Sequence, residues 1–270
     1  MKTVLVDGIE LSLVDRGSGP PVVLVHGFPL DHTMWDAQID ALATSYRVIA
    51  PDLRGFGRSR LDAGVLRPGA TITIERFADD LAEMLDALDI DEPVTLCGLS
   101  MGGYIAMEFY RKYRSRLGKL ALLDTRSEND TPEMAAGRRE MAERVLCEGP
   151  EPLVDGMTPR LFAEATVVDR PEIVEQLRRV MLGNRPNAIA AALLGMAERA
   201  NMTAMLGTID CPTLVLVGEL DAISTAEEMR SIADEVPNCR FEKIAGSGHM
   251  STMEKPAEVN AILLDFLAEV

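Results

Sequence analysis

One serine of the chain has neighbours that suit a nucleophile. Ser100 lies between Gly98 and Gly102 in the segment GLSMG, after an apolar run typical of a strand and before a helical pattern. A tight strand-to-helix turn of this kind holds a hydroxyl at the edge of a sheet, where the N-terminus of the following helix stabilises negative charge. The backbone N–H of Met101 can then point at an oxyanion that forms on a substrate carbonyl.

A serine hydroxyl is a weak nucleophile near neutral pH, so it needs a histidine base and a carboxylate that orients the base. His249 lies in the loop AGSGHM after the last predicted strand, and Asp221 follows another predicted strand. Asp124, at the end of the strand before that one, can also reach the histidine from the neighbouring position. We predict a triad of Ser100, Asp221 and His249, with Asp124 as the alternative acid.

Strand-like and helix-like segments alternate along most of the chain. The run VLV, the turn Asp7-Gly8 and residues 9–14 predict an opening hairpin, because Asp-Gly favours a type I′ turn. Further strands are predicted at 22–25, 46–50, around 94–97, and at 120–123, 213–217 and 241–244, with helices between them and a last helix from Pro256. This order predicts an α/β fold with a mostly parallel central sheet and helices on both faces.

The interval between Arg126 and Cys211 breaks the alternation. It contains no convincing strand, and Pro and Gly signals separate helical stretches at 133–146, 171–182 and 187–199. Seven of the fifteen methionines fall here, and their flexible side chains adapt to irregular apolar ligands. We predict a helical cap over residues 126–211, inserted into a core formed by residues 1–125 and 212–270.

Several motifs together resemble the α/β-hydrolase superfamily over essentially the whole chain. Beside GLSMG, residues 26–29 (HGFP) follow a buried strand and look like the superfamily's H-G-x turn. Residues 52–59 (DLRGFGRS) are similar to its D-x-R-G-x-G-x-S loop. The chain order Ser, Asp, His is also the one expected of this superfamily.

The resemblance implies an α/β-hydrolase fold and an oxyanion hole formed by the backbone N–H groups of Phe28 and Met101. It assigns the triad to the same three residues that the spacing selects. Haloalkane dehalogenases and epoxide hydrolases carry aspartate at the elbow, so the serine at position 100 argues against both activities.

We therefore expect a serine hydrolase that cleaves ester or lactone bonds of small molecules through an acyl-enzyme on Ser100, without a cofactor. Two other functions stay open. Pro29 after Phe28 is similar to the H-G-x-P turn of cofactor-free haloperoxidases, which are perhydrolases that use the same triad with peroxide. The fold can also serve a receptor that binds a small apolar ligand with little turnover, since fold alone does not determine function.

Composition excludes several other classes. The net charge of −16 would repel phosphate backbones and anionic membranes, so we expect no nucleic-acid or membrane partner. The longest apolar stretch, 188–197, is shorter than the roughly 20 residues of a membrane span. The opening segment lacks the apolar region of a secretory signal, which predicts a cytoplasmic location. Four scattered cysteines and three histidines offer no metal-ligand spacing, so no metal is expected. The sequence does not determine the oligomeric state.

Other polar residues are expected to be structural. His26 should brace its own turn, His32 should lie solvated near the mouth of the site, and Asp52 should hold its loop. Ser224 and Glu227 have the spacing of a capping box on the helix after Asp221.

Overall fold

The computed structural model describes residues 1–67 and 69–269. The strands within these residues are β1 (Lys2–Val6), β2 (Ile9–Arg16), β3 (Pro21–Val25), β4 (Arg47–Pro51), β5 (Val94–Leu99), β6 (Leu117–Leu123), β7 (Thr213–Gly218) and β8 (Cys239–Ile244). They form one sheet in the order β1-β2-β4-β3-β5-β6-β7-β8. The pairs from β4 to β8 are parallel, whereas β2 pairs with both β1 and β4 in antiparallel fashion. The prediction of a mostly parallel sheet is confirmed.

The predicted opening hairpin is present. Asp7 and Gly8 have φ angles of 41° and 75°, the positive values that a type I′ turn requires at both central residues. The turn sets Val6 opposite Ile9 and Lys2 opposite Leu13.

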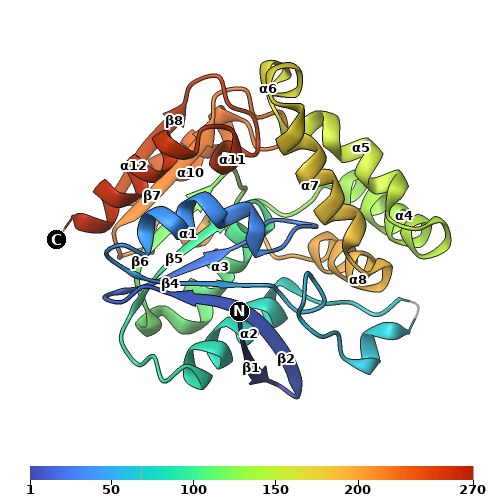
Figure 1. Cartoon of the computed structure of the whole chain (residues 1–270), viewed down its shortest axis with the longest axis horizontal. Coiled ribbons are helices and arrows are strands. Elements are labelled where there is room, and N and C mark those ends of the chain that lie inside the picture. The colour runs from blue at the N-terminus through green and yellow to red at the C-terminus, as the bar shows by residue number, and fades with distance from the viewer. Residues whose placement is uncertain (68, 270) are drawn as a thin grey trace.

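Helices cover both faces of the sheet (Figure 1). One face packs against α1 (Asp36–Leu42) and α12 (Pro256–Ala268), and the other against α2 (Ile74–Ala87), α3 (Met101–Tyr113) and α10 (Ala226–Glu235). Every residue of β3 and β7 is buried, as expected of parallel strands with two covered faces. Four short helices lie outside the interval between β6 and β7: η1 (His32–Trp35), η2 (Ala63–Leu66), η3 (Arg114–Arg116) and α11 (Ser251–Glu254).

Only helices and loops lie between β6 and β7 within the described chain. The helices are α4 (Pro132–Glu148), α5 (Glu151–Leu161), α6 (Glu164–Asp169), α7 (Pro171–Gly183), α8 (Pro186–Ala197) and α9 (Thr203–Leu206). We call α4 to α8 the helical segment, which Figure 1 shows gathered on one side of the sheet. The helices α4, α7 and α8 match the three predicted stretches, and α5, α6 and α9 are additional. No helix in the described residues is both long enough and apolar enough to cross a bilayer.

Candidate active site

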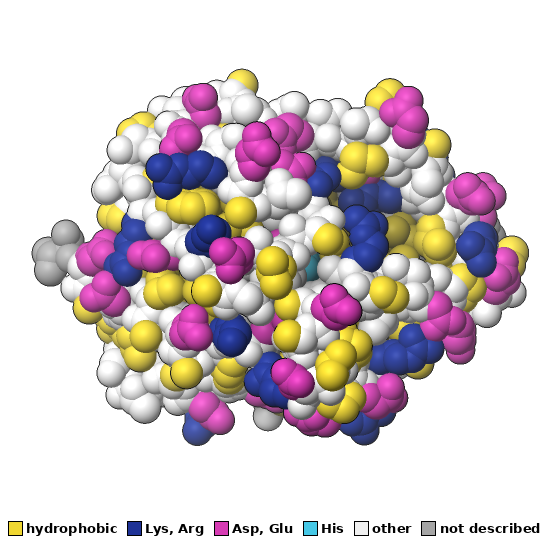
Figure 2. Space-filling model, turned by 90° about the horizontal axis from the view of Figure 1, so that it is seen from above, with side chains coloured by type: hydrophobic (Ala, Val, Ile, Leu, Met, Phe, Trp, Pro, Cys, Tyr) yellow, Lys and Arg dark blue, Asp and Glu magenta, His cyan; other side chains and the backbone are white. Residues whose placement is uncertain are grey.

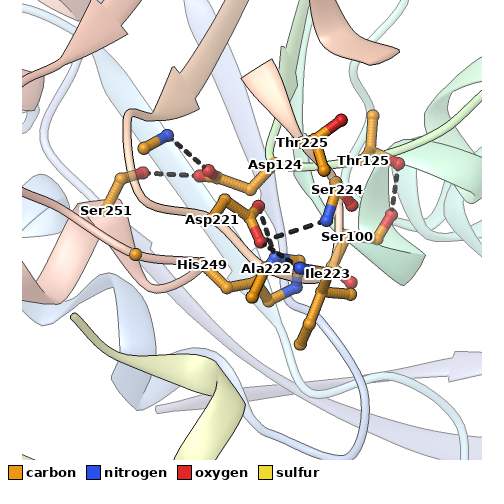
Figure 3. Close-up of polar contacts among 12 residues, drawn as sticks. Ser100, Asp124, Thr125, Asp221, Ala222, Ile223, Ser224, Thr225, His249 and Ser251 are labelled. Carbon is orange, nitrogen blue, oxygen red and sulfur yellow. Dashed lines mark hydrogen bonds and ion pairs between the residues drawn. The ribbon is translucent and has the colours of Figure 1, made fainter. Parts of the chain in front are cut away.

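Ser100 forms the turn between β5 and α3. Its φ of 56° and ψ of −115° lie outside the regions that residues with a side chain normally adopt, at a cost on the order of 1–3 kcal/mol. Two hydrogen bonds hold the backbone in this state. The Ser100 N–H donates to the Leu123 carbonyl of β6 at 2.9 Å, and the Thr125 hydroxyl donates to the Ser100 carbonyl at 2.7 Å (Figure 3).

The glycines on either side of Ser100 explain the spacing of the motif. A Cβ atom on Gly98 would lie 2.1 Å from the Gly102 carbonyl oxygen, and a Cβ atom on Gly102 would lie 2.2 Å from the Val25 carbonyl oxygen of β3. Neither approach is sterically possible without moving the backbone. The first glycine therefore lets α3 begin directly after β5, and the second lets α3 approach β3 closely.

His249 contacts the predicted acid. Its Nδ1 lies 2.8 Å from Oδ2 of Asp221, and both side chains are buried. The other oxygen of Asp221 accepts the N–H groups of Ile223 at 2.7 Å and Ser224 at 3.0 Å, which fixes the carboxylate (Figure 3). Because Asp221 engages Nδ1, Nε2 is the nitrogen available to act as a base.

The serine and the histidine are not hydrogen-bonded in the described chain. No bond joins the Ser100 hydroxyl to the His249 ring, although the two residues lie in one close-up of the site (Figure 3). Such catalytic hydrogen bonds often tighten only when a substrate binds.

The carboxyl group of Asp124, the alternative acid, is hydrogen-bonded to Gly218 and Ser251. Its Oδ1 accepts the Gly218 N–H at 2.8 Å and its Oδ2 accepts the Ser251 hydroxyl at 2.5 Å. Complete burial, and then the negative charge of Asp221, raise the pKa of Asp124 well above its usual value. Both oxygens of Asp124 accept hydrogen bonds from groups other than His249, whereas Asp221 contacts His249 directly, so the geometry favours Asp221 over Asp124.

A third buried carboxylate, that of Glu254 in α11, was missed by the sequence analysis. It accepts four hydrogen bonds, two at Oε1 from the Gly248 N–H (2.7 Å) and the Ser247 hydroxyl (3.2 Å), and two at Oε2 from the Ala163 N–H (2.9 Å) and the Thr166 hydroxyl (2.6 Å). Gly248 directly precedes His249, whereas Ala163 is the N-cap residue of α6 and Thr166 lies within that helix. Glu254 therefore ties the histidine loop to the helical segment. The only sequence signal was a glutamate five positions after the histidine, which names no partner.

The turn formed by residues 26–29 lies against the elbow. A Cβ atom on Gly27 would lie 3.5 Å from the Cβ atom of Ser100. His26 braces this turn as predicted, since its Nε2 accepts the Leu53 N–H at 2.9 Å and its Nδ1 lies 2.8 Å from the Gly27 carbonyl. Burial lowers the pKa of His26, which keeps the ring neutral and suited to this accepting role.

The two predicted oxyanion donors flank the elbow. Met101 is the first residue of α3, and Phe28 follows Gly27 and precedes a cis bond to Pro29. Within the described residues, neither backbone N–H donates a hydrogen bond to another protein group. Both groups are therefore available to an anion that forms beside Ser100.

A cavity of about 310 Å³ opens beside these residues. It begins at Phe28 and at Tyr104, whose N–H donates to the Ser100 carbonyl at 3.3 Å. Its remaining lining is Arg126, Met134, Gly137, Arg138, Met141, Leu153, Met157, Arg160, Leu193 and Ile223. The volume is in the range of small-molecule sites, and three methionines of the helical segment line it.

His32 is not solvated, contrary to the prediction. Its side chain is 12% exposed and its Nδ1 lies 2.6 Å from Oδ1 of Asp52. Burial disfavours the charged ring, but the hydrogen bond and the charge of Asp52 outweigh burial and raise the pKa of His32. Asp31, His32 and Asp52 have potential ligand atoms within 4.8 Å of one another. However, both Asp52 oxygens already accept hydrogen bonds, from His32 and from the Arg58 N–H at 2.9 Å. We therefore interpret this group as structural: it links the loop of His32 to the loop of Asp52.

The predicted capping box is shifted by one residue. Thr225 and Glu228 form it: the Thr225 hydroxyl oxygen accepts the Glu228 N–H at 3.3 Å, and the Glu228 carboxylate accepts the Thr225 N–H at 2.7 Å. The prediction of Ser224 with Glu227 was wrong because the Ser224 N–H already donates to Asp221. The turn that fixes the acid therefore ends where α10 begins.

The sequence model of the α/β hydrolase fold matches residues 20–256. The chain belongs to the α/β-hydrolase family. This α/β-hydrolase is similar to 3-oxoadipate enol-lactonase 1 of Acinetobacter baylyi, with 26% identity over 97% of this chain and 95% of that protein. It is 29% identical to a putative non-heme chloroperoxidase of Synechocystis sp., over 96% and 95% of the two chains. Its fold superposes on a thermophilic esterase from Thermogutta terrifontis, solved with malate bound, with a TM-score of 0.94, 46% identity and coverage of 98% and 97%.

Proposed function

We propose that this α/β-hydrolase is a serine hydrolase of carboxylic esters or lactones of small molecules. The observation that carries the proposal is the buried 2.8 Å contact between His249 and Asp221, in the same site as a serine held at a φ of 56°. A non-glycine residue in that conformation is retained where the surroundings enforce it, and such residues cluster at active sites.

The proposed reaction is an acyl transfer in two halves. His249 Nε2 takes the hydroxyl proton of Ser100 as Oγ attacks the ester carbonyl, and the N–H groups of Phe28 and Met101 stabilise the oxyanion. The histidine returns the proton to the leaving alcohol, which leaves an ester on Ser100. Water attacks this ester with His249 again as base, and the acid is released. Asp221 orients the ring and stabilises its charged form throughout.

The relatives support this reaction class. Enol-lactone opening and ester hydrolysis, the activities named for the Acinetobacter and Thermogutta proteins, both transfer an acyl group to water.

We also propose that residues 126–211 act as a cap over a core of residues 1–125 and 212–270. The proposal is supported by the methionine-lined cavity, to which the helical segment contributes one wall.

Perhydrolysis by the same triad is the second candidate. It is favoured by Pro29 and by the similarity to the putative non-heme chloroperoxidase. Peroxide would then replace water in the second half of the reaction. Peracid formation that remains negligible beside ester hydrolysis at high peroxide concentration removes this candidate.

The test is steady-state hydrolysis of p-nitrophenyl acetate and butyrate and of a simple lactone. We expect sustained turnover by the wild type and a loss of about 10⁴-fold or more in kcat for Ser100→Ala. Ser231→Ala, which removes an exposed hydroxyl on α10, is the matched control and should behave as wild type. Equal turnover by wild type and Ser100→Ala would overturn the proposal. Tight ligand binding without turnover would instead favour a receptor.

A further inference from the structure

The cavity beside Ser100 differs in charge from the rest of the molecule. The chain has 43 acidic and 27 basic residues, yet the described residues that line the cavity include three arginines and no acid. Figure 2 shows Lys or Arg side chains beside hydrophobic ones at the edge of a hollow, with a histidine visible near them. Two of the three arginines pair with acids outside the lining, Arg126 with Glu228 and Arg138 with Asp130, so within the described residues Arg160 supplies the positive charge that is left for an anion.

Two of these arginines approach the same short stretch of backbone. Arg160 of α5 donates to the Ala222 carbonyl at 3.4 Å, and Arg126, just after β6, donates to the Ile223 carbonyl. Both carbonyls belong to the loop that begins at Asp221. The two guanidinium groups therefore lie on the part of the site that also positions the histidine.

Both groups have donors left for a ligand. Arg126 pairs with Glu228 at 2.9 Å, but its Nε is buried without a hydrogen-bond partner. Arg160 is exposed and forms no ion pair within the described chain. By contrast, Arg138 donates its Nε to Asp130 at 2.6 Å. Arg160 therefore has donors free for an anion, and Arg126 lies beside it on the same loop.

Apolar side chains form the remaining wall of the cavity. Leu153 and Met157 of α5 and Leu193 of α8 line it on the side of the helical segment, and Phe28 and Tyr104 line it on the side of the elbow. They suit a short methylene chain.

We propose that the substrate is an ester that carries a second, ionised carboxylate, as in half-esters of dicarboxylic acids. Arg160, with the guanidinium group of Arg126 beside it, binds that carboxylate, and the apolar wall contacts the methylene groups between the two ends. This substrate class rests on the proposed ester hydrolysis at Ser100, but it makes a separate claim about which esters are preferred.

The test compares monoethyl glutarate and monoethyl adipate with the ethyl esters of the corresponding monoamides, which have the same shape without the charge. Ethanol release gives kcat/KM for each. A charge-assisted hydrogen bond to a carboxylate should favour the half-ester over its amide by about 10- to 100-fold in the wild type. Arg160→Gln should lower this ratio about tenfold, with the loss mainly in KM, and Arg160→Lys should retain part of it.

The matched control is Arg144→Gln, which removes the same charge from an exposed position of α4 outside the cavity lining. It should leave the ratio unchanged, because Arg144 does not line the cavity and its exposed charge is paired with Glu148 at 3.3 Å. A ratio near one in the wild type, with turnover that still depends on Ser100, overturns the anionic substrate and leaves ester hydrolysis standing. If no ester is hydrolysed, the proposed function fails. Calorimetric binding of glutarate to wild type and to Arg160→Gln then decides the arginine site, and equal or absent binding overturns it.

Discussion

Replacing Glu254 by glutamine should loosen the loop that carries His249. Each carboxylate oxygen of Glu254 accepts one backbone N–H and one hydroxyl, and the residue is 3% exposed. A glutamine has one accepting oxygen, and its NH₂ group must face the other pair of donors. The hydroxyl of that pair can rotate to accept, but the backbone N–H of Gly248 or Ala163 is left without an acceptor.

The expected loss of stability follows from these contacts. One buried N–H without a partner costs about 1–3 kcal/mol, and the bonds that remain lose their charge-assisted strength. We therefore expect the free energy of unfolding to fall by roughly 2–4 kcal/mol, and Tm to fall by roughly 2–4 °C for each kcal/mol. Because Gly248 precedes His249, kcat should fall about tenfold or more, since small misplacements of a catalytic group are costly. Glu254→Ala leaves both N–H groups unpaired and should lose more.

Urea and thermal unfolding followed by circular dichroism, together with kcat on a p-nitrophenyl ester, test this reasoning. Glu258→Gln is the matched control, because it makes the same charge change at an exposed position of α12. If Glu254→Gln has the Tm and kcat of Glu258→Gln, the proposed link between the histidine loop and α6 does not hold.

Three further predictions concern the acids and the elbow. Asp221→Asn should lower kcat by about 10⁴-fold, whereas Asp124→Asn should stay within about tenfold of wild type; the reverse order in steady-state assays would make Asp124 the orienting acid. Burial and the charges of Asp221 and Glu254 raise the pKa of Asp124 in the native protein. The native protein therefore binds the proton of this carboxyl group more tightly than the unfolded protein does, and the contribution of Asp124 to stability falls as pH rises from about 4. The free energy of unfolding of Asp124→Asn should therefore rise relative to that of wild type as pH increases. If the two proteins show parallel free energies of unfolding in urea from pH 4 to 8, this effect is excluded. Gly98→Ala should lose soluble folded protein or activity, because its Cβ would lie 2.1 Å from the Gly102 carbonyl oxygen; a fully active, equally stable variant would contradict the elbow geometry.

Local patterns account for what the sequence predicted about the fold. A continuous apolar run identified β3, Asp7-Gly8 identified the hairpin, and alternating segments identified the parallel sheet. These features depend on neighbouring residues along the chain. The contact between Asp221 and His249 was also expected, because both follow strands whose ends share one edge of the sheet.

Features that depend on distant residues could not be predicted in this way. The partner of Glu254 in α6, Thr166, lies 88 positions away, and the bond of Asp124 to Ser251 spans 127 positions. His32 is half-buried because Asp52, on another loop, accepts its hydrogen bonds. The arginines of the cavity come from α4, α5 and the loop after β6, so their convergence on one hollow appears only once the chain is folded.

The central claim is that Ser100 becomes covalently acylated. Intact-mass and peptide mass spectrometry after treatment with diethyl p-nitrophenyl phosphate tests this most directly, because this reagent leaves a stable phosphate ester on an activated serine. We expect one adduct on the peptide that contains Ser100, much slower labelling of His249→Ala, and no adduct on this peptide in Ser100→Ala. Wild-type protein that stays unlabelled, or an adduct on another residue, would contradict it.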